Sequence, residues 1–150
     1  MSKPNYDDLN VQESWCIEQQ KVVANYLRSQ KVQHGRIGDR PAWHVAPVAS
    51  IWAIEGLARP DCIGWWVICG DLPTDYISAA DVSQPQHPRK VMRVFAKNWF
   101  ALVEAWKHGR EIENTQIADP SLKEKLAPIL VARASLLMEW ADNDSLWEKK

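Results

Sequence analysis

Two apolar runs in the middle of the chain predict a β-hairpin. Residues 63–69 are continuously apolar and end at Gly70. Seven residues are too few to cross a membrane, and an uninterrupted apolar run is typical of a strand covered on both faces. Residues 48–55 are rich in β-branched and aromatic side chains, which favours a second strand. Because residues 56–61 have turn chemistry, we predict an antiparallel hairpin of 48–55 and 63–69 with a six-residue connection.

Apolar residues at helical spacing predict three helices. The first spans about residues 8–33, before a glycine stop at Gly35. The second begins at Pro88, a residue suited to the first position of a helix, and runs to residue 107 or 108. The third opens at residues 119–120 and continues to about Trp140. Three helices are therefore expected around the hairpin.

These elements predict an α+β fold, with three main helices packed on a small antiparallel sheet centred on the hairpin 48–55/63–69. Residues 77–80 are expected to add a short strand. A chain of 150 residues without a recognisable linker is about the size of one domain. We therefore expect residues 1–150 to form a single globular domain.

Composition limits the classes of partner. The chain is 46% hydrophobic and 25% charged, with a formal net charge of −1. Such a composition is typical of a soluble globular protein and gives no overall attraction to nucleic acid or anionic lipid. We expect neither a nucleic-acid nor a membrane partner. The first eight residues lack the apolar core of a secretion signal, so a cytoplasmic location with reduced cysteines is expected.

Tryptophan is unusually frequent, with nine residues in the chain. Burying so many indole rings requires several packed layers, or an interface that a partner covers. A small sheet that is apolar on both faces also needs more cover than three helices readily provide. We therefore expect a homodimer, with a further protein partner as another occupant of such a surface.

An acidic turn follows the second strand and supplies the first candidate site. Asp71, Asp75 and Tyr76 lie at the end of this turn, and Pro73 lies between the two aspartates. Two neighbouring carboxylates can divide acid and base roles, one protonated and one ionised. Aspartates beside glycine and proline also hydrogen-bond their own backbone, which is a purely structural role. Both explanations remain open, as does a ligand contact by Tyr76 or by His44.

Positive charge gathers at the start of the second helix. Residues 41–81 carry a net charge of −4 and residues 82–110 a net charge of +5. Arg89 and Lys90 lie in the first turn, where the helix dipole disfavours cations, and Arg93 follows one turn later. Something negative is expected there. The alternatives are Asp75 or Asp81 of the same chain, and an anionic ligand or acidic partner.

The common signatures of enzymes and metal sites are absent from the sequence. The four histidines show no i, i+4 pair and no Cys-x-x-Cys motif accompanies them. The chain has no Gly-x-Ser-x-Gly elbow, no Walker lysine loop and no Gly-x-Gly-x-x-Gly after a strand. We therefore assign no catalytic residue, no metal ligand and no cofactor.

The string Ile-Gly-Trp-Trp-Val-Ile-Cys-Gly-Asp-Leu-Pro-Thr-Asp-Tyr-Ile at 63–77 resembles a small family of uncharacterised bacterial proteins. The resemblance covers roughly residues 41–109 and includes the aromatic hairpin before a Gly-Asp-Leu-Pro-Thr-Asp-Tyr turn. It implies a bacterial protein of one domain, and it implies no activity.

Two function hypotheses follow. The first is a non-catalytic interaction or regulatory module, and its small size would also suit an immunity-like role. The second is an anion-binding protein or a hydrolase, with a pocket between the 70–77 turn and the Pro88 helix. Its site residues would be Asp71, Asp75, Tyr76, Arg89, Lys90, Arg93 and His44.

Overall fold

The computed structural model describes residues 4–108 and 123–147. They contain three α-helices and a four-stranded antiparallel sheet, which confirms the predicted α+β class. The chain divides into two compact units, Met1–Ala79 and Ala80–Lys150. That residues 1–150 form one domain stays a prediction. Within the two described stretches, no helix is both long enough and apolar enough to span a membrane.

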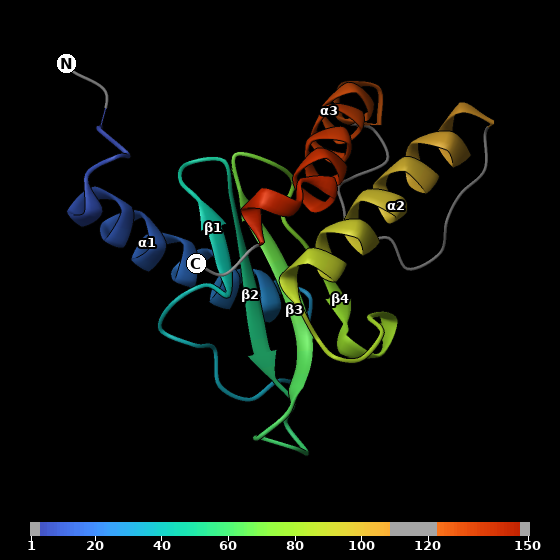
Figure 1. Cartoon of the computed structure of the whole chain (residues 1–150). Coiled ribbons are helices and arrows are strands. Elements are labelled where there is room, and N and C mark those ends of the chain that lie inside the picture. The colour runs from blue at the N-terminus through green and yellow to red at the C-terminus, as the bar shows by residue number, and fades with distance from the viewer. Residues whose placement is uncertain (1–3, 109–122, 148–150) are drawn as a thin grey trace. The chain divides into compact units, whose positions relative to one another are not determined.

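The first unit contains one helix and the whole sheet (Figure 1). The strands follow one another in the sheet in the order of the sequence, and each pairs antiparallel with the next. In chain order the elements are α1 (Leu9–Ser29), β1 (Trp43–Val45), β2 (Ala49–Glu55), β3 (Ile63–Gly70) and β4 (Asp75–Ser78).

The predicted hairpin is the centre of this sheet. β2 pairs with β3, with Ile54 opposite Trp65 and Ala53 opposite Trp66. Successive side chains of a strand alternate between faces, so the two indole rings point to opposite sides of the sheet. The connection spans residues 56–62, one residue longer than predicted, because Cys62 belongs to it as well. The register shifts between Ile54 and Glu55.

Both edge strands differ from the prediction. The sequence did not indicate β1, which has only three residues and pairs back onto β2. Pro47 lies in the turn between these strands, rather than at the start of the second. β4 begins at Asp75 instead of residue 77, because it pairs with β3 from Ile68 onward. Asp75 and Tyr76, which we predicted at the end of a turn, are therefore strand residues.

α1 ends at Ser29, four residues before the predicted end. Its last turn closes as a Schellman motif, in which the Lys31 N–H donates to Arg28 O and the Val32 N–H to Leu27 O, both at 3.1 Å. Lys31 has a φ of 58°, the left-handed conformation that this motif requires. A glycine usually occupies that position, so the sequence pointed to Gly35 instead.

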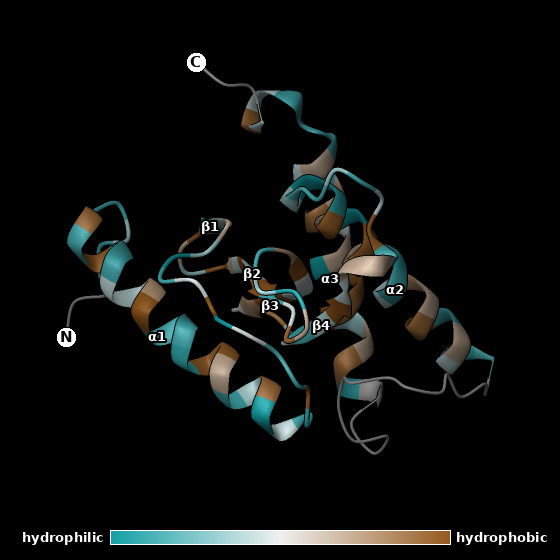
Figure 2. Ribbon diagram, turned by 90° about the horizontal axis from the view of Figure 1, so that it is seen from below, coloured by the Kyte–Doolittle hydropathy of each residue, from teal (hydrophilic) through white to brown (hydrophobic). Residues whose placement is uncertain are grey.

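The core of the first unit lies between α1 and the central strands. α1 packs on β2 and β3. Figure 2 shows α1 running along the sheet, with apolar and polar residues alternating along its ribbon. The fully buried cluster joins two residues of α1 to both strands of the hairpin: Val23, Leu27, Trp52, Ile54, Val67 and Cys69.

The second unit is built on two helices that pack against each other, α2 (Pro88–Lys107) and α3 (Lys123–Asp142). α2 has the predicted bounds, and His87 caps its first turn. The predicted opening of the third helix at 119–120 lies outside the described residues. α3 ends at Asp142, and a short 3-10 turn, Asp144–Leu146, follows it.

Candidate functional site

The first unit contains an open groove of about 680 Å³ beside the end of α1. Residues 30–33, which follow α1, form one side. Leu57 and Ala58 come from the connection between β2 and β3, and Trp65 and Tyr76 come from β3 and β4. The lining is mainly apolar, as in most ligand and peptide sites. Lys31 is the one charged side chain among the lining residues.

Two aromatic rings line this groove, Trp65 and Tyr76, and a third ring, Tyr26, packs against Tyr76. Tyr76 packs edge-on against Trp65, with ring centroids 5.7 Å apart, and against Tyr26 of α1 at 5.9 Å. The Trp65 indole N–H donates to Gln33 O at 3.2 Å, which joins the strand to the segment after α1. Because these rings brace one another, the apolar surface of the groove is preformed.

Tyr26 carries a polar atom without a partner. Within the described residues, its hydroxyl is buried and makes no hydrogen bond. Burial raises the pKa of Tyr26 above its ordinary value, and the negative charge of Asp75 adds to that effect. The neutral phenol is therefore the form that the fold favours.

The predicted acidic residues occupy different environments. Asp71 is exposed in the turn after β3, and its backbone N–H donates to Val48 O at 2.9 Å. Asp75 is only 5% exposed at the start of β4. An oxygen of Asp75 accepts the Tyr76 N–H at 2.8 Å. A local bond of this kind is what the structural explanation of these aspartates anticipates.

His44 lies on β1, and its ring is 6.3 Å from the ring of Trp15 in α1. Burial lowers the pKa of His44, so the neutral imidazole is favoured. Together with Asp71, Asp75 and Tyr76 it belongs to the first unit, and among these Tyr76 lines the groove.

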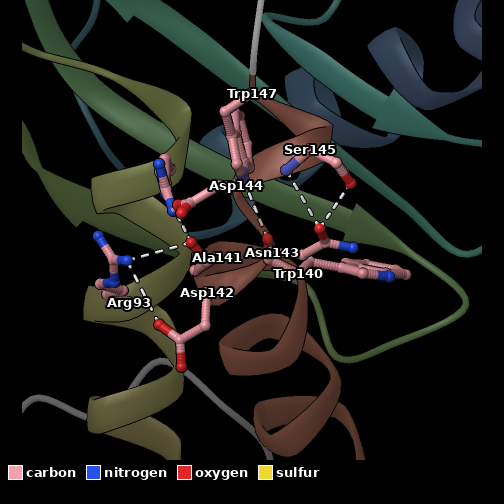
Figure 3. A network of polar contacts seen from close by, with 9 residues as sticks. Arg93, Trp140, Ala141, Asp142, Asn143, Asp144, Ser145 and Trp147 are labelled. Carbon is pink, nitrogen blue, oxygen red and sulfur yellow. Dashed lines mark hydrogen bonds and ion pairs between the residues drawn. The ribbon is translucent and has the colours of Figure 1, made fainter.

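The cationic residues at the start of α2 belong to the second unit, and two of them, Arg89 and Arg93, meet the end of α3. Figure 3 shows Arg93 beside this end of the helix. Arg89 donates to Ala141 O and forms an ion pair with Asp144. Arg93 donates to the same carbonyl at 3.1 Å and approaches Asp142 at 3.3 Å. The last carbonyls of a helix lack partners within it and carry its negative dipole end. The two arginines therefore cap the C-terminus of α3.

Lys90 turns toward the loop before α2. Its ammonium donates to Ser83 O at 3.3 Å and to Pro85 O at 3.0 Å. The first turn of α2 thus contacts carbonyls and carboxylates of its own unit. The sequence named Asp75 or Asp81 as acidic partners and gave no sign of the residues after α3, because a pairing over about 50 positions leaves no periodic pattern.

Buried nucleophilic groups of the first unit are held in structural bonds. The hydroxyl of Ser50 accepts the Trp52 indole N–H at 2.8 Å and lies 3.2 Å from Cys69 O. Burial raises the pKa of the Cys69 thiol to about 11. A thiol with so high a pKa is a poor nucleophile at neutral pH. This network ties β2 to β3.

Of the eight residues that line the groove, sequence reasoning named only Tyr76 as a site residue, and Lys31, Leu57 and Trp65 are among those it missed. Trp65 was predicted as a strand residue, and Leu57 as part of a turn. Lys31 was placed inside the first helix, where its left-handed backbone could not be foreseen. Leu57 was the available signal, since a large apolar residue inside a predicted surface turn indicates an exposed apolar surface.

Comparison with known proteins adds one finding. No curated protein and no solved structure matches the chain. A family described as a domain of unknown function, DUF4826, matches residues 9–147, which includes the described part of both units from α1 onward. This extends well beyond residues 41–109, on which the resemblance rested. The chain therefore belongs to the DUF4826 family, whose function is unknown.

Proposed function

We propose that the chain is a non-catalytic interaction module that works as a homodimer, with the groove of the first unit as its contact surface. A bacterial, cytoplasmic setting and a regulatory, immunity-like role belong to the same proposal. The observation that carries it is the groove, where Trp65 and Tyr76 stand beside Leu57, which is 61% exposed.

The chemistry of the groove suits a protein partner. Tryptophan and tyrosine are the residues that most often dominate binding energy at protein interfaces. The groove is open, so a small ligand would keep much of its surface in water, whereas a protein surface can cover the whole patch. The three braced rings lose little freedom on binding, which favours association.

The contact surface differs from the one that first suggested a dimer. We expected a dimer contact on an uncovered face of the hairpin. Within the first unit, the face that carries Trp52, Ile54 and Val67 is buried against α1. The apolar residues of the groove, in contrast, remain accessible. We therefore propose the groove as the dimer contact.

The proposal is tested by size-exclusion chromatography with light scattering. Wild type is expected at twice the chain mass at micromolar concentration, and Leu57→Asp at the mass of one chain, because a buried carboxylate would oppose contact. Leu146→Asp is the matched control, since this leucine is 44% exposed and lies outside the groove. Equal dimerisation of both variants would exclude the groove as the contact surface.

The anion-binding or hydrolase alternative stays a prediction. It relied on cations that await an anion, and Arg89 and Arg93 already contact the end of α3. No further observation favours it, and its phosphate test is given in the Discussion.

A further inference from the structure

The segment that follows α1 carries a cation without a partner among the residues that the structure describes. The ammonium of Lys31 makes no hydrogen bond and no ion pair with any residue in 4–108 or 123–147. Its backbone has a φ of 58°, where glycine would be free of strain. Lys31 thus combines a strained backbone with a charge that is open to a partner on the wall of the groove.

The other end of α1 carries complementary chemistry. Leu9 is 78% exposed, more than any other large apolar residue in the described stretches. It falls on the same helical stripe as the buried Cys16 and Val23, because seven residues separate each from the next. Figure 1 shows the first turns of α1 extending beyond β1, so this stripe continues past the sheet.

An unpaired carboxylate stands next to Leu9. Asp8 is occupied, because its side chain accepts the N–H groups of Asn10 and Val11 as the cap of α1. Asp7 is exposed, and within the described residues its carboxylate makes neither a hydrogen bond nor an ion pair. This end of α1 thus presents one apolar anchor and one free negative charge.

The two ends cannot meet within one chain. α1 has 21 residues, and at 1.5 Å per residue it holds them about 30 Å apart. Consider two copies related by a two-fold axis, with their α1 helices antiparallel. Each end of α1 in one copy would then meet the opposite end of α1 in the other copy. The same contact then forms twice, and the opposed helix dipoles are favourable.

We propose that, in the homodimer, the first turn of α1 of each copy seats in the groove of the other. Leu9 covers the apolar surface at Leu57 and Trp65, and Asp7 pairs with Lys31. This inference rests on the proposed function, since it names the segment that occupies the groove. Charge complementarity and the distance between the two ends select a second copy as the occupant.

Charge reversal tests the contact. Lys31→Glu and Asp7→Lys are each expected to raise the dimer dissociation constant at least about tenfold, because each sets like charges against each other twice. The double variant Lys31→Glu/Asp7→Lys is expected to restore the dissociation constant to near that of wild type. Lys107→Glu, an exposed lysine in the last turn of α2, is the matched control and should leave it unchanged.

Lys31→Gly separates binding from folding. It relieves the left-handed strain, so its melting temperature should rise, yet its dimer should be weaker than that of wild type. A lysine with a merely structural role would not shift the two readouts in opposite directions. Sedimentation equilibrium measures the dimer. A thermal melt below the dissociation constant measures the fold of the single chain, because dimerisation itself would raise the melting temperature.

Failure has two distinguishable forms. If wild type dimerises and the charge reversals leave the dissociation constant unchanged, or the double variant is not restored, the seating of α1 in the groove is wrong and the homodimer stands. If wild type remains one chain at every concentration, both this inference and the proposed homodimer are wrong.

Discussion

Gly70 is the residue whose backbone most constrains the turn before β4. Its φ is +141°, and a Cβ added there would lie 2.5 Å from Val48 O. Gly70→Ala should lower the free energy of unfolding by about 1–3 kcal/mol, the usual cost of such strain. Urea unfolding measures it.

Gly38→Ala is the matched control, because its Cβ would come no closer than 3.5 Å to a neighbouring atom. It should be neutral or slightly stabilising, since alanine restricts the unfolded chain. Equal stability of the two variants would show that the conformation of Gly70 is wrongly described.

The buried hydroxyl of Tyr26 makes a prediction about stability. Tyr26→Phe removes a polar atom that has no partner within the described residues, so stability at pH 7 should stay the same or rise by up to about 1 kcal/mol. The raised pKa of Tyr26 favours the neutral form in the native state. Between the unfolded pKa of about 10 and the higher folded value, the native state binds more protons than the unfolded state, so stability falls as pH rises.

Wild type should therefore lose more stability than Tyr26→Phe above about pH 10. Denaturant melts from neutral to alkaline pH measure the difference. A loss of more than about 1 kcal/mol at pH 7 on removal of the hydroxyl would mean that it has a partner.

For single residues, the sequence identified which side chains could bind a ligand better than it identified where they lie in the fold. It selected Asp75 and Tyr76, and the structure places Asp75 in the core and Tyr76 in the groove. It could not identify Lys31, because a left-handed backbone at a lysine leaves no mark in composition or periodicity. Such positions depend on hydrogen bonds that only the folded helix end reveals.

Among the elements, those with long periodic patterns were predicted well. α2 and the hairpin β2–β3 agree with the sequence to within about one residue. β1 was missed because three residues are too few to show an alternating pattern. α1 was predicted too long because its end is set by a Schellman motif without glycine.

The contact between α2 and the end of α3 makes a prediction about the anion-site alternative. Arg89→Ala should lower the free energy of unfolding by about 1–2 kcal/mol, because it takes a charged donor from the buried residue Ala141. The Arg89 side chain is 25% exposed, so solvent screens the interaction only in part. Lys97→Ala, an exposed position on the same helix, is the control and should change little.

Phosphate completes this test. About 10 mM phosphate should leave the melting temperature of wild type unchanged, although it would saturate a site with a sub-millimolar dissociation constant. A rise in wild type that disappears in Arg89→Ala would establish an anion site at the start of α2 and revive the alternative.

For the whole molecule, the sequence is enough to identify the family, but it does not locate the groove. The DUF4826 match covers residues 9–147, so the family is defined by both units together. The groove draws on the segment after α1, the hairpin connection, β3 and β4, which are distant in the sequence. Such a surface arises from tertiary packing, and a sequence pattern alone could not have located it.

Self-association of the chain is measured by sedimentation equilibrium of wild type. Over about 1–100 μM, a range that brackets micromolar dissociation constants, the average mass should reach that of two chains and level off there. A mass of one chain throughout this range would contradict self-association.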